Sequence, residues 1–121
     1  MPSARRASII GCELLAAMAE DGTTIFAEIE AVLADATPPL DALEDTLTAG
    51  YAAALALEAE RWRIERGISA AAASLGSGSD DGQAQEIANL ARRLDVAEGD
   101  LARLRELLAT LRDRASAARA A

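Results

Sequence analysis

The C-terminal third of the chain carries apolar residues at alternating spacings of three and four. The series runs through Ile87, Leu90, Leu94, Ala97, Leu101, Leu104, Leu108, Leu111, Ala115 and Ala118. Spacing of this kind places every member along one face of an α-helix, as in helices that pack against other helices. The pattern predicts a long helix over about residues 82–119.

A second helix is predicted over about residues 38–75. Thr37 precedes Pro38 and Pro39, which matches an N-cap residue followed by proline in the first helical turn. The apolar positions of this segment occupy more than one face, as expected of a helix that packs on two neighbours. They are Leu40, Leu43, Leu47, Tyr51, Leu55, Leu57, Trp62, Ile64 and Ile68.

Charged residues of the second segment are spaced for ion pairs along one helix. Glu58 lies three residues before Arg61, and Glu60 lies three residues before Arg63. Side chains three or four positions apart are neighbours on a helix surface. We therefore expect both pairs to form on the exposed side of the helix.

The N-terminal segment predicts a first helix over about residues 3–36. Ile25, Ile29 and Val32 continue an apolar face that begins at Ile10 and Leu14. The stretch Asp21-Gly22 either kinks or breaks this helix, because glycine weakens a helix interior. Gly22 is equally compatible with close approach of a neighbouring helix.

The connection over residues 76–82 is rich in glycine and serine, which is typical of a flexible linker. Asp80 stands three residues before Gln83, as in a capping box for the last helix. Alanine and leucine dominate the chain, and β-branched residues are sparse. We expect one all-α domain over residues 1–121, an elongated antiparallel three-helix bundle or coiled coil.

Composition narrows the possible functions. The 121 residues carry 12 basic and 20 acidic side chains, a net charge of −8, so nucleic-acid binding is not expected. Histidine and lysine are absent, which removes the commonest general base, the commonest transition-metal ligand and Schiff-base chemistry. The residues Glu13, Glu28, Glu58 and Glu86 could line a bundle, but a di-metal site of that kind also uses histidine. We expect no enzyme activity, metal or cofactor.

The cellular location is predicted from the N-terminal sequence, the length of the apolar runs and the number of cysteines. Arg5 and Arg6 precede an apolar stretch that ends in Cys12, but this stretch is too short for a signal sequence, and Glu13 interrupts it. No uncharged apolar run reaches the roughly 18 residues of a membrane span. A single cysteine is compatible with a reducing compartment. We expect a cytoplasmic protein that has no membrane association.

Four stretches of the chain resemble the FlgN-type flagellar export chaperones. They are residues 40–43 (LDAL), 58–61 (EAER), 73–76 (ASLG) and 101–108 (LARLRELL). The resemblance implies a small acidic helical protein of the cytoplasm. It also implies that the protein binds unassembled hook-associated subunits before secretion, by receiving an amphipathic helix of the client. It assigns no site residue.

Two functions follow from these patterns. The first is a non-enzymatic protein-binding module, chaperone-like or adaptor-like, that binds a partner helix through an apolar groove. Trp62 is a candidate contact because tryptophan is enriched in interface hot spots, although a core or boundary anchor is the alternative. The other candidates lie on the third helix: Leu101, Leu104, Leu107, Leu108 and Leu111. The second function is a structural protein that self-assembles into a homo-oligomer through the same helix.

Overall fold

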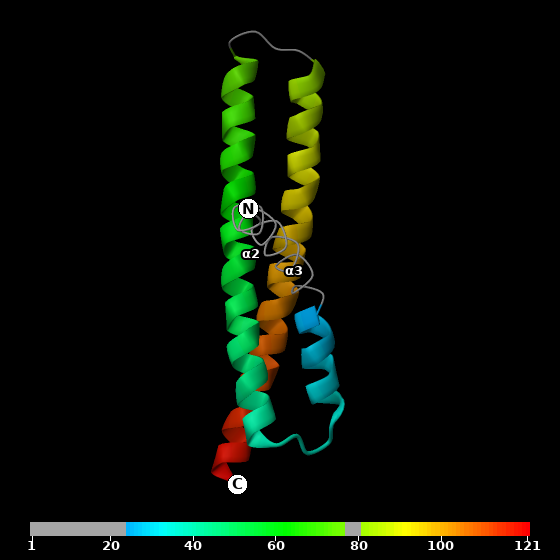
Figure 1. Cartoon of the computed structure of the whole chain (residues 1–121), viewed down its shortest axis with the longest axis vertical. Helices are drawn as coiled ribbons and strands as arrows, with labels where there is room; N and C mark the ends of the chain where they lie inside the picture. The colour runs from blue at the N-terminus through cyan, green and yellow to red at the C-terminus, as the bar shows by residue number, and fades with distance from the viewer. Residues whose placement is uncertain (1–23, 77–80) are drawn as a thin grey trace, which may run out of the picture. The chain divides into compact units, whose positions relative to one another are not determined.

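The computed structural model describes residues 24–76 and 81–121, and within these ranges the regular secondary structure is helical. Residues 24–34 form a helical segment, and two long helices follow, α2 (Leu40–Leu75) and α3 (Asp81–Ala120) (Figure 1). The long helices pack together in a bundle-like arrangement, which confirms the predicted all-α class. The predicted kink or break at Asp21-Gly22 and the predicted cap at Asp80 lie outside the described residues.

Helix α2 begins two residues later than predicted. The backbone N–H of Leu43 donates to the carbonyl oxygen of Pro39 at 3.1 Å, so Pro39 holds the N-cap position. The predicted N-cap at Thr37 is wrong: its own N–H donates to Asp35 Oδ1 at 3.1 Å, in a turn before the helix. The cause is local, because a residue that precedes proline is disfavoured in the helical region. Pro38 precedes Pro39, so the helical conformation is disfavoured at Pro38, and α2 starts at Leu40.

The chain divides into two compact units. Of the described residues, the first comprises 24–53 with Leu107–Ala121, and the second comprises those between Ala54 and Glu106. Helices α2 and α3 each contribute to both units. Each of these two units has its own set of packed side chains among the described residues.

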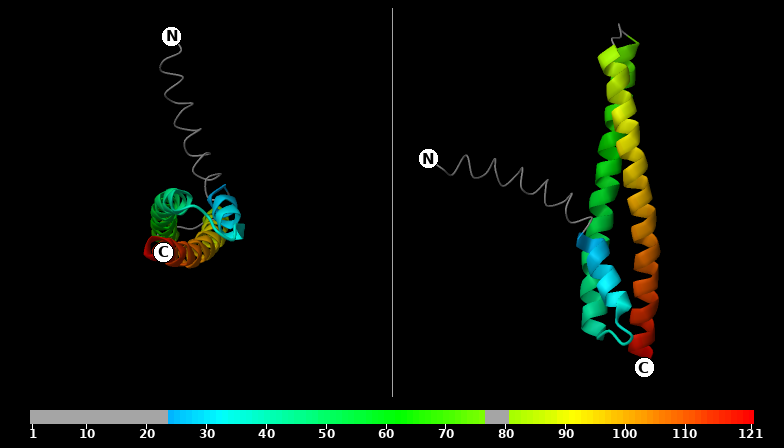
Figure 2. Two further views of the ribbon diagram at one scale, coloured as in Figure 1. Left: turned by 90° about the horizontal axis from the view of Figure 1, so that it is seen from below. Right: turned by 90° about the vertical axis from the view of Figure 1, so that its right-hand side faces the viewer.

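In the first unit, residues 24–34 lie beside the first turns of α2 and the last turns of α3 (Figures 1 and 2). The buried side chains come from all three segments: Ile25, Phe26, Ile29, Leu43, Leu47, Leu108, Leu111 and Ala115. Gly50 permits close packing at the centre. A Cβ atom placed there would overlap Leu108 Cδ2 and would lie 3.9 Å from Ile29 Cδ1.

Two arginines of α3 join the segments of the first unit on its surface. Arg114 Nη1 donates to the carbonyl oxygen of Leu33 at 3.0 Å, where the segment 24–34 leaves its last carbonyls without intrahelical donors. Arg119 forms an ion pair with Glu44 of α2 at 3.3 Å. Glu44 lies near the start of α2 and Arg119 near the end of α3, so the two helices run antiparallel in this unit.

In the second unit, α2 and α3 form an antiparallel pair whose core contains Ile64, Leu90 and Ala97. Ile68 and Leu94 pack against this cluster. Burial along α3 follows the pattern read from the sequence. Seven of its ten apolar positions are buried and the other three, Ile87, Leu94 and Ala118, are half-buried. The predicted packing face of α3 is confirmed.

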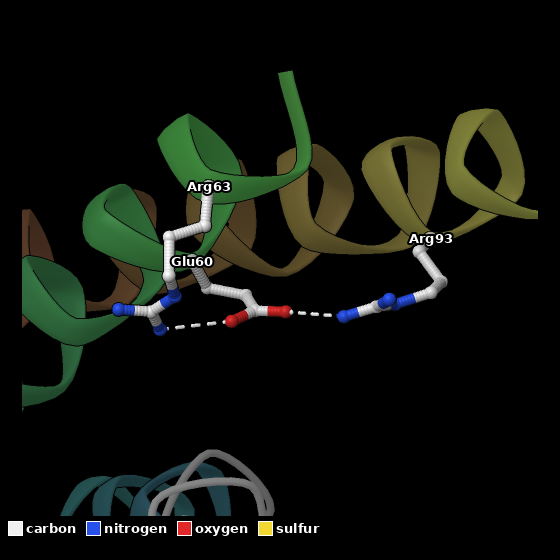
Figure 3. A network of polar contacts seen from close by, with 3 residues as sticks. All are labelled: Glu60, Arg63 and Arg93. Carbon is white, nitrogen blue, oxygen red and sulfur yellow. Dashed lines mark hydrogen bonds and ion pairs between the residues drawn. The ribbon is translucent and has the colours of Figure 1, made fainter. Parts of the chain in front are cut away.

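Ion pairs flank the packed face of the second unit. Glu60 accepts hydrogen bonds from Arg63 of its own helix at 2.9 Å and from Arg93 of α3 at 2.8 Å (Figure 3). The predicted pair of Glu60 with Arg63 is therefore confirmed. The predicted pair of Glu58 with Arg61 is wrong.

Glu58 and Arg61 do not pair because their side chains lie at different positions around α2. Glu58 is close enough to α3 to accept a hydrogen bond from Arg105 at 2.6 Å. Arg61 pairs instead with Glu65 one turn further along its own helix, at 3.7 Å. Spacing within one helix allowed both pairings, and the neighbouring helix selected between them.

The Glu60 contacts predict a small pH dependence of stability. The hydrogen bond from Arg63 is the largest influence on the pKa of Glu60 and lowers it, partial burial raises it, and the hydrogen bond from Arg93 lowers it. The net effect is a pKa below the ordinary value. Stabilisation by Glu60 is then complete above its unfolded-state pKa of about 4.3 and is lost as pH falls through the lower folded-state pKa.

Replacing Glu60 by glutamine tests this dependence. The difference in free energy of unfolding between the wild-type protein and Glu60→Gln is expected to shrink as pH falls from about 6 to about 3, because the protonated carboxyl resembles the amide. Urea denaturation followed by circular dichroism at each pH measures the difference. Glu86→Gln is the control, because Glu86 is exposed and forms no ion pair with the described residues. A difference that stays constant over this pH range would contradict the prediction.

Candidate protein-binding surface

Four of the predicted partner-binding residues fill the core of the chain itself. Their exposed fractions are 1% for Leu101, 0% for Leu104, 4% for Leu108 and 0% for Leu111. Leu107 is half-buried. A partner could touch the four buried leucines only if the packed helices separated. Their part in binding stays a prediction. The large apolar side chains that a partner could reach without such separation include Trp62 and Leu55 of α2.

Trp62 lies on the surface of α2 with 60% of its area exposed. Of the alternative interpretation, a core or boundary anchor, the core position is therefore wrong. The guanidinium carbon of Arg66 lies 4.9 Å from the centroid of the Trp62 ring, within the range of a cation–π contact. The two residues are four positions apart on one helix, so the fold of α2 itself brings them together.

Trp62 belongs to a longer exposed row along α2. Leu55, Ala59, Trp62, Arg66 and Ser69 follow one another at spacings of four, three, four and three, and all five are exposed. This row is called the outer face of α2 in the following. Leu55 is 67% exposed, and it lies two helical turns from the exposed Trp62. The two large apolar side chains of this row thus remain uncovered by the described residues.

The sequence contained the signal for this row, because its spacing is the same as that of the packed face of α3. The sequence pattern included Leu55 and Trp62 among the apolar positions of a helix expected to pack on two neighbours, and Trp62 was also a candidate partner contact. The structure shows instead that the packed face of α2 runs through Leu47, Ala54 and Ile64. The wide apolar surface of α2 therefore consists of one buried face and one exposed face.

Charges around the outer face are mostly neutralised within the second unit. Glu58 is paired with Arg105, and Glu65 is paired with Arg61. Arg66 differs from these residues: its contact is the Trp62 ring, and it forms no ion pair with a described carboxylate. The surface therefore combines two large apolar side chains with one arginine whose charge has no acidic partner among the described residues.

The acidic residues named as possible bundle-lining ligands do not form a cluster in the described part of the chain. Glu28 and Glu86 are exposed and Glu58 is half-buried, whereas Glu13 lies outside the described ranges. In residues 24–76 and 81–121, no three acidic or thiol side chains are grouped so that they could hold a metal ion. Over the same residues, no helix has an apolar stretch long enough to cross a lipid bilayer. The outer face of α2 presents exposed apolar side chains, Leu55 and Trp62.

Comparisons with protein-family models, with curated proteins and with solved structures gave no match for this chain.

Proposed function

We propose that this protein is a non-enzymatic helical binding module, and that the outer face of α2 receives a helix of a protein partner. The observation that carries the proposal is the exposure of Leu55 and Trp62, which lie seven residues apart on one side of α2. A partner helix with the same spacing of apolar residues would pack along this row. No catalytic step is required of any residue.

The energetics of such a contact are favourable. Burying a leucine side chain fully contributes about 1.5–3 kcal/mol, and tryptophan and arginine are among the residue types most enriched in interface hot spots. Ala59 and Ser69, between and beyond the larger residues, have small side chains that would let a partner backbone approach closely. The outer face therefore offers an aromatic anchor, with the small Ala59 before it and Arg66 and then the small Ser69 after it.

A chaperone or adaptor role in the cytoplasm belongs to the same proposal. The resemblance to FlgN-type flagellar export chaperones supports a client that presents an amphipathic helix. The acidic composition agrees with that type of protein. Under this proposal the client would be a protein subunit held before its assembly.

Replacing Trp62 by alanine is the direct test of the proposed surface. The variant is expected to weaken binding of the partner by at least about 1 kcal/mol while the helical content stays unchanged, because Trp62 is exposed and lies outside the core. The partner is first captured from a lysate of the native host and identified by mass spectrometry. Its affinity for wild-type and variant protein is then measured by calorimetry.

Val96→Ala is the matched control, because Val96 is 64% exposed on α3 and lies outside the outer face of α2. The control should bind the partner as the wild-type protein does. Equal affinity of Trp62→Ala and wild type would remove Trp62 from the binding surface. Absence of any stoichiometric partner would contradict the binding function itself.

Self-association through α3 remains the alternative prediction. It requires residues such as Leu101 and Leu104 to leave the core of the chain, where they are buried. Sedimentation equilibrium of the purified protein distinguishes the two functions, because a binding module without its partner is expected to be monomeric. A stable oligomer with no captured partner would favour the alternative.

A further inference from the structure

We infer that the helix received by the outer face of α2 is acidic on one flank and pairs a carboxylate with Arg66. This inference rests on the proposed function and adds the chemistry of the partner. Arg66 differs from the ion-paired arginines of the second unit, and a docked helix would remove water from its guanidinium group.

Arginines of the second unit are generally engaged by polar groups. Arg61 pairs with Glu65, Arg63 and Arg93 pair with Glu60, and Arg105 pairs with Glu58. Arg92 donates a hydrogen bond to Asn89 Oδ1. Arg103 is not without a partner either. Arg66, by contrast, contacts the Trp62 ring and forms no ion pair with a described carboxylate. In a chain with more carboxylates than arginines, this leaves one cation locally uncompensated on the outer face.

Docking of a helix on Leu55 and Trp62 would cover Arg66 as well, because all three lie along the same row of α2. Removing an arginine from water without an acidic partner costs several kcal/mol, which would oppose binding. A carboxylate on the partner offsets this cost and can accept two hydrogen bonds from the planar guanidinium. An uncharged apolar helix is therefore the poorer occupant of this surface.

The spacing of residues along α2 also indicates where on the partner helix the acidic residue would lie. Arg66 lies one helical turn from Trp62, and Leu55 lies two turns away on the opposite side. The partner helix would then carry its apolar residues against Leu55 and Trp62, with a glutamate or aspartate about one turn beyond them. Stacking on the Trp62 ring holds the guanidinium near this position before the partner arrives.

A displayed library of helical peptides tests the inference. The probe is a set of 21-residue peptides with a fixed leucine and alanine row, whose flanking positions vary among glutamate, glutamine, lysine and serine. Selection is carried out on wild-type protein, Arg66→Gln and Arg66→Glu, and peptides that also bind Trp62→Ala are discarded. Wild type should enrich glutamate at one flanking position, Arg66→Gln should lose this preference, and Arg66→Glu should enrich lysine there.

Affinities of one selected peptide then isolate the pair. Changing its enriched glutamate to glutamine is expected to weaken binding to wild type about tenfold and to leave binding to Arg66→Gln unchanged. Arg112→Glu is the control, because Arg112 is another exposed arginine without a described ion pair, on α3. The control should keep the wild-type preference for glutamate.

The outcomes separate the inference from the proposed function. Peptides that need Trp62 but show no charge preference tied to Arg66 would overturn the acidic partner and leave the binding surface standing. Failure to select any peptide that depends on Trp62 would overturn the proposed surface. Self-association of the protein that Trp62→Ala abolishes would make a second copy the occupant, and would overturn the inferred partner.

Discussion

Replacing Leu104 by alanine is expected to lower the free energy of unfolding by about 2–5 kcal/mol. Leu104 of α3 has 0% of its area exposed, so the shortened side chain would leave a cavity among packed neighbours. Alanine is the best helix former, which means that the loss cannot come from weakened helix propensity. Urea denaturation followed by far-ultraviolet circular dichroism measures the change.

Leu55→Ala makes the same chemical change at an exposed position. Leu55 is 67% exposed on α2, so its truncation is expected to alter the free energy of unfolding by less than about 0.5 kcal/mol. Equal effects at the two positions would contradict the assignment of a buried face to α3 and an exposed face to α2. Dissociation of an oligomer by Leu104→Ala without loss of stability would instead favour self-association through α3.

Replacing Gly50 by valine is the second substitution with a large expected effect. A Cβ atom at this position would overlap Leu108 Cδ2, and Leu108 is itself 4% exposed and has little room to move. Forcing extra methyl groups into a packed core costs about 1–3 kcal/mol. We expect a loss of this size in the free energy of unfolding, measured by the same denaturation experiment.

Gly99→Val is the matched control, because a Cβ atom at Gly99 would meet no heavy atom within 4 Å. Valine has a higher helix propensity than glycine, so this variant should be as stable as the wild type or slightly more stable. A comparable loss at both positions would show that glycine is needed in these helices for a reason other than close packing at Gly50. Wild-type stability of Gly50→Val would show that the first unit tolerates wider helix separation.

Residues that stabilise the fold and residues proposed to bind a partner are distinct on α2. Leu47 and Ile64 are buried, whereas Leu55 and Trp62 are exposed. Substitutions at Leu55 and Trp62 can therefore be read as effects on binding, because little stability is expected to change with them. Substitutions of the buried leucines cannot be interpreted in this way, because they would lower the stability of the fold. These leucines are Leu101, Leu104, Leu108 and Leu111.

Local pattern predicted the helices and their approximate ends. The apolar row of α3 was correct because a spacing of three and four defines one helix face whatever covers it. The start of α2 was misplaced because two adjacent prolines were read as the first turn, although the first of them is excluded from helical geometry by the second. The Glu60–Arg63 pair was predictable because both residues belong to one helix.

Contacts between helices were decided by the tertiary structure. The sequence showed that α2 has apolar residues on more than one face, but a pattern within one helix contains no information about which face a neighbour covers. The same limit explains why Glu58 was assigned to Arg61, although Arg105 of α3 is its partner. The helical class and the packing face of α3 were thus determined by the sequence alone, since both depend on residues close together along the chain. Which row of α2 is buried and which row stays exposed depends on residues far apart in the sequence, and only the packed structure brings those together.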